Sequence, residues 1–158
     1  MKAATKTAKV RSKSKGSGYQ RTMNTSLMPV YDSLCAILKP YEKKLKKKMY
    51  AKDFYYLETH EPVYRGKPMC YGGVRLGKQY VSYYLMSVYM SPELMKNMSP
   101  ELKKRMQGKS CFNFTKVDPK LFAELKALTK AGSALFDKTD WKALDAKTSK
   151  WTELKGKA

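Results

Sequence analysis

Acidic residues are scarce in this sequence, which has 13 Asp and Glu against 33 Lys and Arg and a formal net charge of +20 over 158 residues. A surface with this excess repels cations and attracts polyanions, so nucleic acid or an acidic protein is the expected class of partner. The excess is not confined to the ends of the chain, because residues 22–137 alone carry 20 basic and 10 acidic side chains. The folded part is therefore expected to be basic as well.

Histidine occurs once, at His60, and cysteine three times, at Cys35, Cys70 and Cys111. His60 lies in a loop between Glu58 and Glu61, but with no second histidine and no catalytic spacing a solvated side chain is favoured over a catalytic or metal-binding one. The cysteines are odd in number, widely spaced and without a CxxC pair, which is typical of neither a disulfide framework nor a closed zinc site. We therefore predict a non-enzymatic, cytoplasmic protein with no catalytic residues.

Long hydrophobic runs are also missing, and none approaches the length of about 20 residues that crosses a bilayer. The N-terminus lacks the apolar stretch of a secretory signal. Residues 1–22 hold seven basic side chains and no acid, which predicts a disordered basic arm. Residues 138–158 are Lys-rich and weakly amphipathic, and we expect a C-terminal tail there that either docks or stays mobile. The segment between them, residues 23–137, is predicted to form one domain.

Apolar periodicity in this domain predicts an order of helix, strands, short helices, strand and helix. The expected elements are a helix from Asn24 to about Leu38, a strand over 53–58 (a helix there is the alternative), strands over 69–76 and 78–86, a strand over 109–115, and a helix from Asp118 to near Gly132. Helices flank the strands instead of alternating with them. This order predicts an α+β fold, a largely antiparallel sheet with helices packed on one face.

Two basic clusters are candidate polyanion-binding residues. The first lies in residues 39–52, where seven basic residues accompany one acid and are expected to surround a helix. The candidates of both clusters are Lys43, Lys44, Lys46, Lys47, Lys48, Lys103, Lys104 and Arg105. Contacts of this kind are salt-sensitive and carry no sequence information. The alternative is that these lysines form only a solubilising coat.

Tyrosine is abundant, with 12 residues, most of them in the strand region. Alternation along the strands places Tyr71 and Arg75 on one face of the first hairpin strand, and Tyr80 and Tyr84 on one face of the second. If this side of the sheet is open, the four residues form a sheet-face binding site. Tyrosines beside cations can stack bases or dock a protein. The alternative is that they are half-buried packing residues with solvated hydroxyl groups.

The segment from Val63 to Met69, an aromatic residue followed by Gly-Lys-Pro and an apolar residue, resembles the YdhG-like family of small bacterial proteins. The similarity continues through the hairpin over 77–84, the strand over 108–114 and the closing helix, and it covers roughly residues 22–137. The resemblance implies a frataxin-like fold, with two helices on one face of an antiparallel sheet. One class of members is associated with intracellular iron delivery for iron–sulfur cluster and haem assembly, and most members have no assigned function.

The resemblance thus implies an alternative role as an iron chaperone-like protein or a partner in iron–sulfur assembly. Frataxin-type iron contact uses an acidic ridge on the first helix and first strand, since iron ions prefer carboxylate oxygen. Here the first helix offers Asp32 and Glu42, and residues 39–52 have a net charge of +6. Iron is therefore disfavoured by charge, and we predict no cofactor and no metal ligands. The sequence leaves the physiological ligand and the oligomeric state open.

Overall fold

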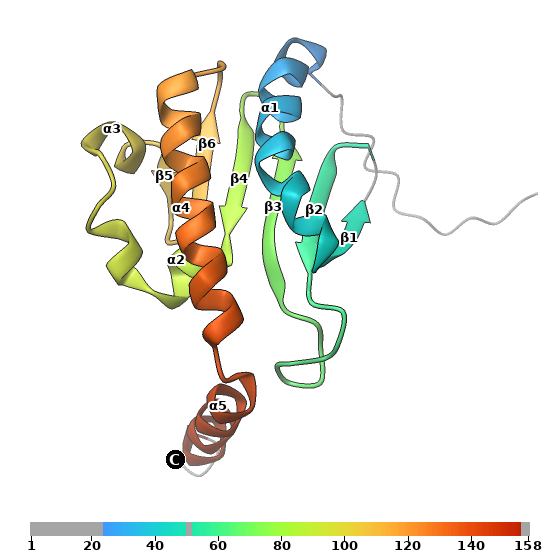
Figure 1. The fold of residues 1–158 in the computed structure, drawn as a ribbon, viewed down its shortest axis with the longest axis vertical. Helices are drawn as coiled ribbons and strands as arrows, with labels where there is room; N and C mark the ends of the chain where they lie inside the picture. The colour runs from blue at the N-terminus through green and yellow to red at the C-terminus, as the bar shows by residue number, and fades with distance from the viewer. Residues whose placement is uncertain (1–23, 50–51, 156–158) are drawn as a thin grey trace, which may run out of the picture.

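The computed structural model describes residues 24–49 and 52–155, with side chains as far as residue 148. The predicted basic arm, residues 1–22, lies outside the described residues. The described strands are β1 (Lys46–Met49), β2 (Phe54–Glu58), β3 (Cys70–Leu76), β4 (Val81–Leu85), β5 (Met106–Gln107) and β6 (Cys111–Phe114). They form one sheet in the order β1-β2-β3-β4-β6-β5, and every neighbouring pair is antiparallel (Figure 1).

The helices lie on one side of this sheet. They are α1 (Met28–Leu38), α2 (Met86–Met90), α3 (Pro100–Lys103), α4 (Pro119–Lys138) and α5 (Trp141–Lys155), with 3-10 turns at Thr25–Leu27, Lys39–Lys43 and Pro92–Met95. Figure 1 shows α1 and α4 lying across the same face, and α5 continuing beyond the end of α4. The predicted α+β fold, an antiparallel sheet with helices packed on one face, is confirmed.

Local signals set the helix boundaries. The Asn24 side chain accepts a hydrogen bond from the Ser26 amide at 3.1 Å, and α1 ends at Leu38, just before Pro40 removes a backbone donor. At the start of α4, Asp118 accepts from the Leu121 amide at 3.1 Å. These three signals act within a few residues, which is why the sequence predicted them.

The predicted end of α4 near Gly132 is wrong, because the helix continues to Lys138. Gly132 lies in the helix interior where α4 crosses α2. A Cβ atom at this position would overlap Ser87 Oγ and lie 2.8 Å from Ser87 Cβ. The glycine therefore permits a close helix crossing and does not end the helix.

The core fills the layer between the helices and the sheet. Alternate residues of β4, Val81, Tyr83 and Leu85, are fully buried, as the predicted strand pattern requires. Two buried tyrosines connect the sheet to α4: the Tyr71 hydroxyl donates to the Thr129 carbonyl oxygen at 2.8 Å, and the Tyr83 hydroxyl lies 2.7 Å from Thr129 Oγ1. These bonds satisfy polar groups in an otherwise apolar layer and fix the position of α4 over β3 and β4.

Residues 138–158 were expected to form a tail, and the structure shows a helix there over Trp141–Lys155. Asp140 accepts a hydrogen bond from the Ala143 amide at 3.0 Å at the helix start. The Trp141 ring packs edge-on against Phe136 of α4, with 4.8 Å between centroids. The first turn of α5 therefore contacts the domain. No helix among the described residues is long and apolar enough to cross a membrane.

Candidate functional site

The sheet has a second face, over which no described helix lies, and the strand register identifies the residues on it. Residues that pair across neighbouring strands point to the same face. One row across the sheet is Lys48, Tyr56, Gly73, Tyr84 and Cys111, and the next is Phe54, Arg75, Ser82 and Asn113. We call these two rows, together with Lys46 and Glu58, the open face.

Three aromatic rings form the centre of the open face. Phe54 and Tyr56 lie with their planes 30° apart and 5.5 Å between centroids, and Phe54 meets Tyr84 edge-on at 6.5 Å. All three side chains are partly exposed. Between them lies Gly73, where a Cβ atom would stand 2.8 Å from Tyr56 Cβ. The glycine thus leaves room for the rings, and the three aromatic residues form a platform on the sheet.

Polar groups occupy the open face beside this platform. Ser82 Oγ donates to Asn113 Oδ1 at 2.8 Å, and Asn113 Nδ2 donates to Gln107 Oε1 at 2.6 Å. Arg75 and Tyr84 line an open cavity of about 360 Å³, whose lining also includes Ser82 and residues 77–80 of the hairpin. An arginine and two tyrosines therefore line one cavity on this face.

Cations also lie at the β1 edge of the open face. Lys46 and Lys48 share this side of β1, and Lys48 Nζ lies 2.8 Å from Glu58 Oε1. Glu58 is 6% exposed and also accepts from the Tyr56 hydroxyl at 3.2 Å. This one carboxylate therefore holds both a cation and a platform ring in place.

The predicted helix around Lys43–Lys48 is wrong, because the cluster spans the end of a 3-10 turn and the edge strand β1. A strand directs successive side chains to opposite faces, so the cluster is divided. Lys47 points away from the open face and lies 3.7 Å from Glu42, and Lys44 pairs with Asp137 of α4. Lys43 is exposed just before β1.

The second predicted cluster lies at the other end of the sheet. Lys103 and Lys104 are exposed at the end of α3, and the Arg105 carbonyl oxygen accepts from the Asn113 amide at 2.8 Å, beside edge strand β5. Six strands at roughly 4.8 Å spacing separate the two edges by about 24 Å. The structure therefore does not unite the two basic clusters but places them at opposite edges of the sheet, with only part of each on the open face.

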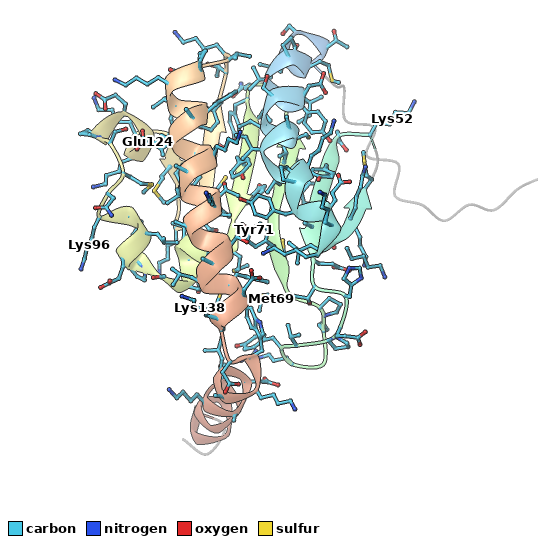
Figure 2. All side chains as sticks on the ribbon, in the orientation of Figure 1. Lys52, Met69, Tyr71, Lys96, Glu124 and Lys138 are labelled. Atoms are coloured by element: carbon cyan, nitrogen blue, oxygen red, sulfur yellow. The ribbon has the colours of Figure 1, made fainter. Side chains whose placement is uncertain are left out.

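Of the four predicted sheet-face residues, Arg75, Tyr80 and Tyr84 line the same cavity, and Tyr80 is 37% exposed. The prediction for Tyr71 is wrong, because this residue is fully buried beneath the helices (Figure 2). The pairing shifts between β2 and β3, where Leu57 pairs with Gly72 but Glu58 pairs with Cys70. Tyr71 is the extra residue of this bulge, and the bulge reverses its face.

Sequence reasoning missed Phe54 and Tyr56 as site residues. The alternation along β2 indicates them: Tyr55 and Leu57 are buried in the core, whereas Phe54 and Tyr56 are partly exposed. That alternation becomes informative once the covered face is known.

The cysteines lie in environments that favour the protonated thiol. Burial raises the pKa of Cys35 and of Cys70 to about 11, and burial also raises the pKa of Cys111. At neutral pH these sulfur atoms are therefore weak nucleophiles. No group of three or more His, Cys, Asp or Glu side chains in the described part of the chain is arranged to hold a metal ion.

Comparison of the chain with protein-family models, with curated proteins and with solved structures finds no match. The YdhG-like and frataxin-like assignment, and the iron-related role that it implies, stay predictions.

Proposed function

We propose that this protein is a non-enzymatic binding protein that associates with single-stranded nucleic acid through the open face of its sheet, without sequence specificity. The observation that carries the proposal is the aromatic platform of Phe54, Tyr56 and Tyr84 on a face that no described helix covers. Bases stack on such rings whatever their identity, because every base has a π-face.

The position of the cations supports a strand that crosses the sheet. Lys46 and Lys48 lie at one end of the platform, Arg75 pairs with Phe54 in the next strand, and Lys78 lines the cavity. Phosphate groups of a strand whose bases stack on the rings would lie within reach of these charges. Arg105, beside the β5 edge, offers a further cation to a nucleic-acid strand that crosses the whole sheet.

Single-stranded nucleic acid fits this face better than a duplex does. The rings are partly exposed on a sheet surface and would need unpaired bases to stack on them. Part of the hydrogen-bonding capacity of the polar groups on this face is already used, because Ser82, Asn113 and Gln107 bond to one another. The face therefore favours stacking and charge over reading of base edges.

The test is fluorescence anisotropy with labelled oligothymidylate of 12 nucleotides at increasing salt. Four phosphate contacts on a single strand give a slope of log affinity against log salt near −3, so affinity should fall about 50-fold between 50 and 200 mM salt. Lys46→Gln should reduce the slope by about 0.7. Its matched control is Lys126→Gln, which removes an equal charge from the exposed side of α4.

The proposal fails if binding is insensitive to salt, or if Lys126→Gln changes the slope as much as Lys46→Gln. The second outcome would show that net charge alone attracts the oligonucleotide. Far-UV circular dichroism of both variants checks that the fold is retained.

A further inference from the structure

A second concave site lies away from the open face. It is a groove of about 890 Å³ between the loop over residues 63–69, α2 and the first turns of α5. Its lining includes Met69, Met86, Met90, Trp141, Arg65 and Lys67, and we call it the α2–α5 groove. Figure 2 labels Met69 close to the point where α4 ends and α5 begins. None of the open-face residues lines this groove.

The floor of the α2–α5 groove is apolar and adaptable. Three methionine side chains supply flexible thioethers, which fill irregular shapes and accommodate a flexible ligand. Trp141 is held by its packing on Phe136, and Leu144 extends the same wall by one helical turn. A concave, mostly apolar site of this size with a few polar groups is typical of a small-molecule site.

The polar groups of the groove are cationic. Arg65 and Gly66 both adopt left-handed backbone conformations, with φ of 50° and 66°, and the Lys67 amide donates to the Tyr64 carbonyl oxygen at 3.0 Å. This tight turn fixes the position of the two basic residues on either side of Gly66. The Arg65 guanidinium lies 5.4 Å from the centre of the Tyr64 ring, another residue of the lining.

These charges lack a counter-ion within the groove. No carboxylate lines it, and neither Arg65 nor Lys67 forms an ion pair within the described ranges 24–49 and 52–155. An apolar floor with two uncompensated cations at one wall is complementary to a molecule with an apolar body and an anionic head.

We propose that the α2–α5 groove binds an aliphatic carboxylate, with its chain on the methionine and tryptophan wall and its carboxylate at Arg65 and Lys67. A peptide strand fits less well, because the groove is bounded by helices and a closed turn and offers no free sheet edge for backbone pairing. The flexible methionine floor suits an alkyl chain, and the fork of a guanidinium suits a carboxylate.

The chain carries its own probe for this site. It has two tryptophans, Trp141 in the groove and Trp151 further along α5. The full-length Trp151→Phe variant therefore reports on Trp141 alone. Decanoate, below its micelle concentration, should give a saturable blue shift of the emission as it displaces water from the groove. Decanol and decylammonium, of equal chain length, should bind progressively more weakly.

The cationic wall is tested by Arg65→Gln/Lys67→Gln in the same background. We expect decanoate affinity to fall about five- to tenfold, with decanol affinity unchanged, because two partly exposed charge contacts are removed. The matched control is Lys103→Gln/Lys104→Gln, which removes the same charge at α3. Lys67→Gln alone, which leaves Arg65 in its turn, serves if the double variant is misfolded by circular dichroism.

The inference is overturned if decanoate gives no saturable change, if decanol or decylammonium binds as tightly as decanoate, or if the α3 control weakens decanoate equally. Saturable decanoate binding that the Arg65 and Lys67 substitutions weaken selectively supports it. Addition of oligothymidylate should leave decanoate affinity unchanged, so the result does not depend on whether the open face binds nucleic acid.

Discussion

Replacement of Tyr56 by leucine tests the aromatic platform directly. Tyr56 is the ring that stacks on Phe54 at 5.5 Å, and its hydroxyl donates to Glu58 at 3.2 Å. Stacking of one base on an aromatic side chain contributes about 1–3 kcal/mol, so Tyr56→Leu should weaken oligothymidylate binding roughly 5- to 150-fold. The lost ring pair and the lost hydrogen bond to Glu58 should together lower the free energy of unfolding by about 1–3 kcal/mol, and urea unfolding shows how much folded protein is available for the assay.

Two further variants separate stacking from other effects of the substitution. Tyr56→Phe keeps the ring but loses the hydrogen bond to Glu58, and it should retain most of the affinity. Tyr89→Leu removes a tyrosine that is 57% exposed and lies outside the open face, and it should leave binding unchanged. Anisotropy titrations at a single low salt concentration measure all three, with urea unfolding as the stability control.

The reasoning is refuted if Tyr56→Leu and Tyr89→Leu have equal effects on oligothymidylate affinity. A second readout uses heparin, a polyanion without bases. If Tyr56→Leu weakens heparin and oligothymidylate equally, the ring acts through the shape or charge of the face and not through stacking.

Two predictions concern the fold. Gly132→Ala should destabilise the protein by about 1–2 kcal/mol in urea unfolding, because overpacking against Ser87 outweighs the gain of up to about 1 kcal/mol in helix propensity. Ser87→Gly combined with Gly132→Ala should recover much of this stability. If the double variant is as unstable as Gly132→Ala alone, the close crossing of α2 and α4 is contradicted. Because burial raises the pKa of Cys70 to about 11, the folded state favours the neutral thiol, and the resulting stability is present below about pH 9 and is lost as the pH rises through 11. The free energy of unfolding of both proteins should be measured at pH 8.5 and pH 11, and its decrease should be about 1–2 kcal/mol smaller in Cys70→Ala than in the unsubstituted protein. Equal decreases in the two proteins would contradict the raised pKa of Cys70.

The sequence predicted the features of this fold that depend on near neighbours in the chain. Asn24 and Asp118 cap helices because their side chains reach amides two or three residues away. The alternation of Val81, Tyr83 and Leu85 places all three in the core, because side chains of an unbroken strand alternate between faces. The order of such elements was sufficient for the α+β class.

Other features were not predictable because they depend on contacts between distant segments. Tyr71 follows the same local alternation as its neighbours, but the bulge between β2 and β3 turns it into the core, where it meets Thr129 of α4. Gly132 carries a local signal for a helix end, yet the helix continues to Lys138 and the missing side chain leaves room for Ser87 of α2. In both cases the pairing partner, which local sequence does not specify, determines the outcome.

Composition determines the net charge and the excess of tyrosine, and these two properties are sufficient to make a polyanion the expected class of partner. Tertiary structure alone decides where those residues lie. The strand register divides the Lys43–Lys48 cluster between two faces, and the strand order separates this cluster from Arg105 by the width of the sheet. The same register brings Phe54, Tyr56 and Tyr84 together around Gly73. The physical reason is that charge is a sum over residues, whereas a surface is defined by the long-range pairing of strands and by the face that the helices cover.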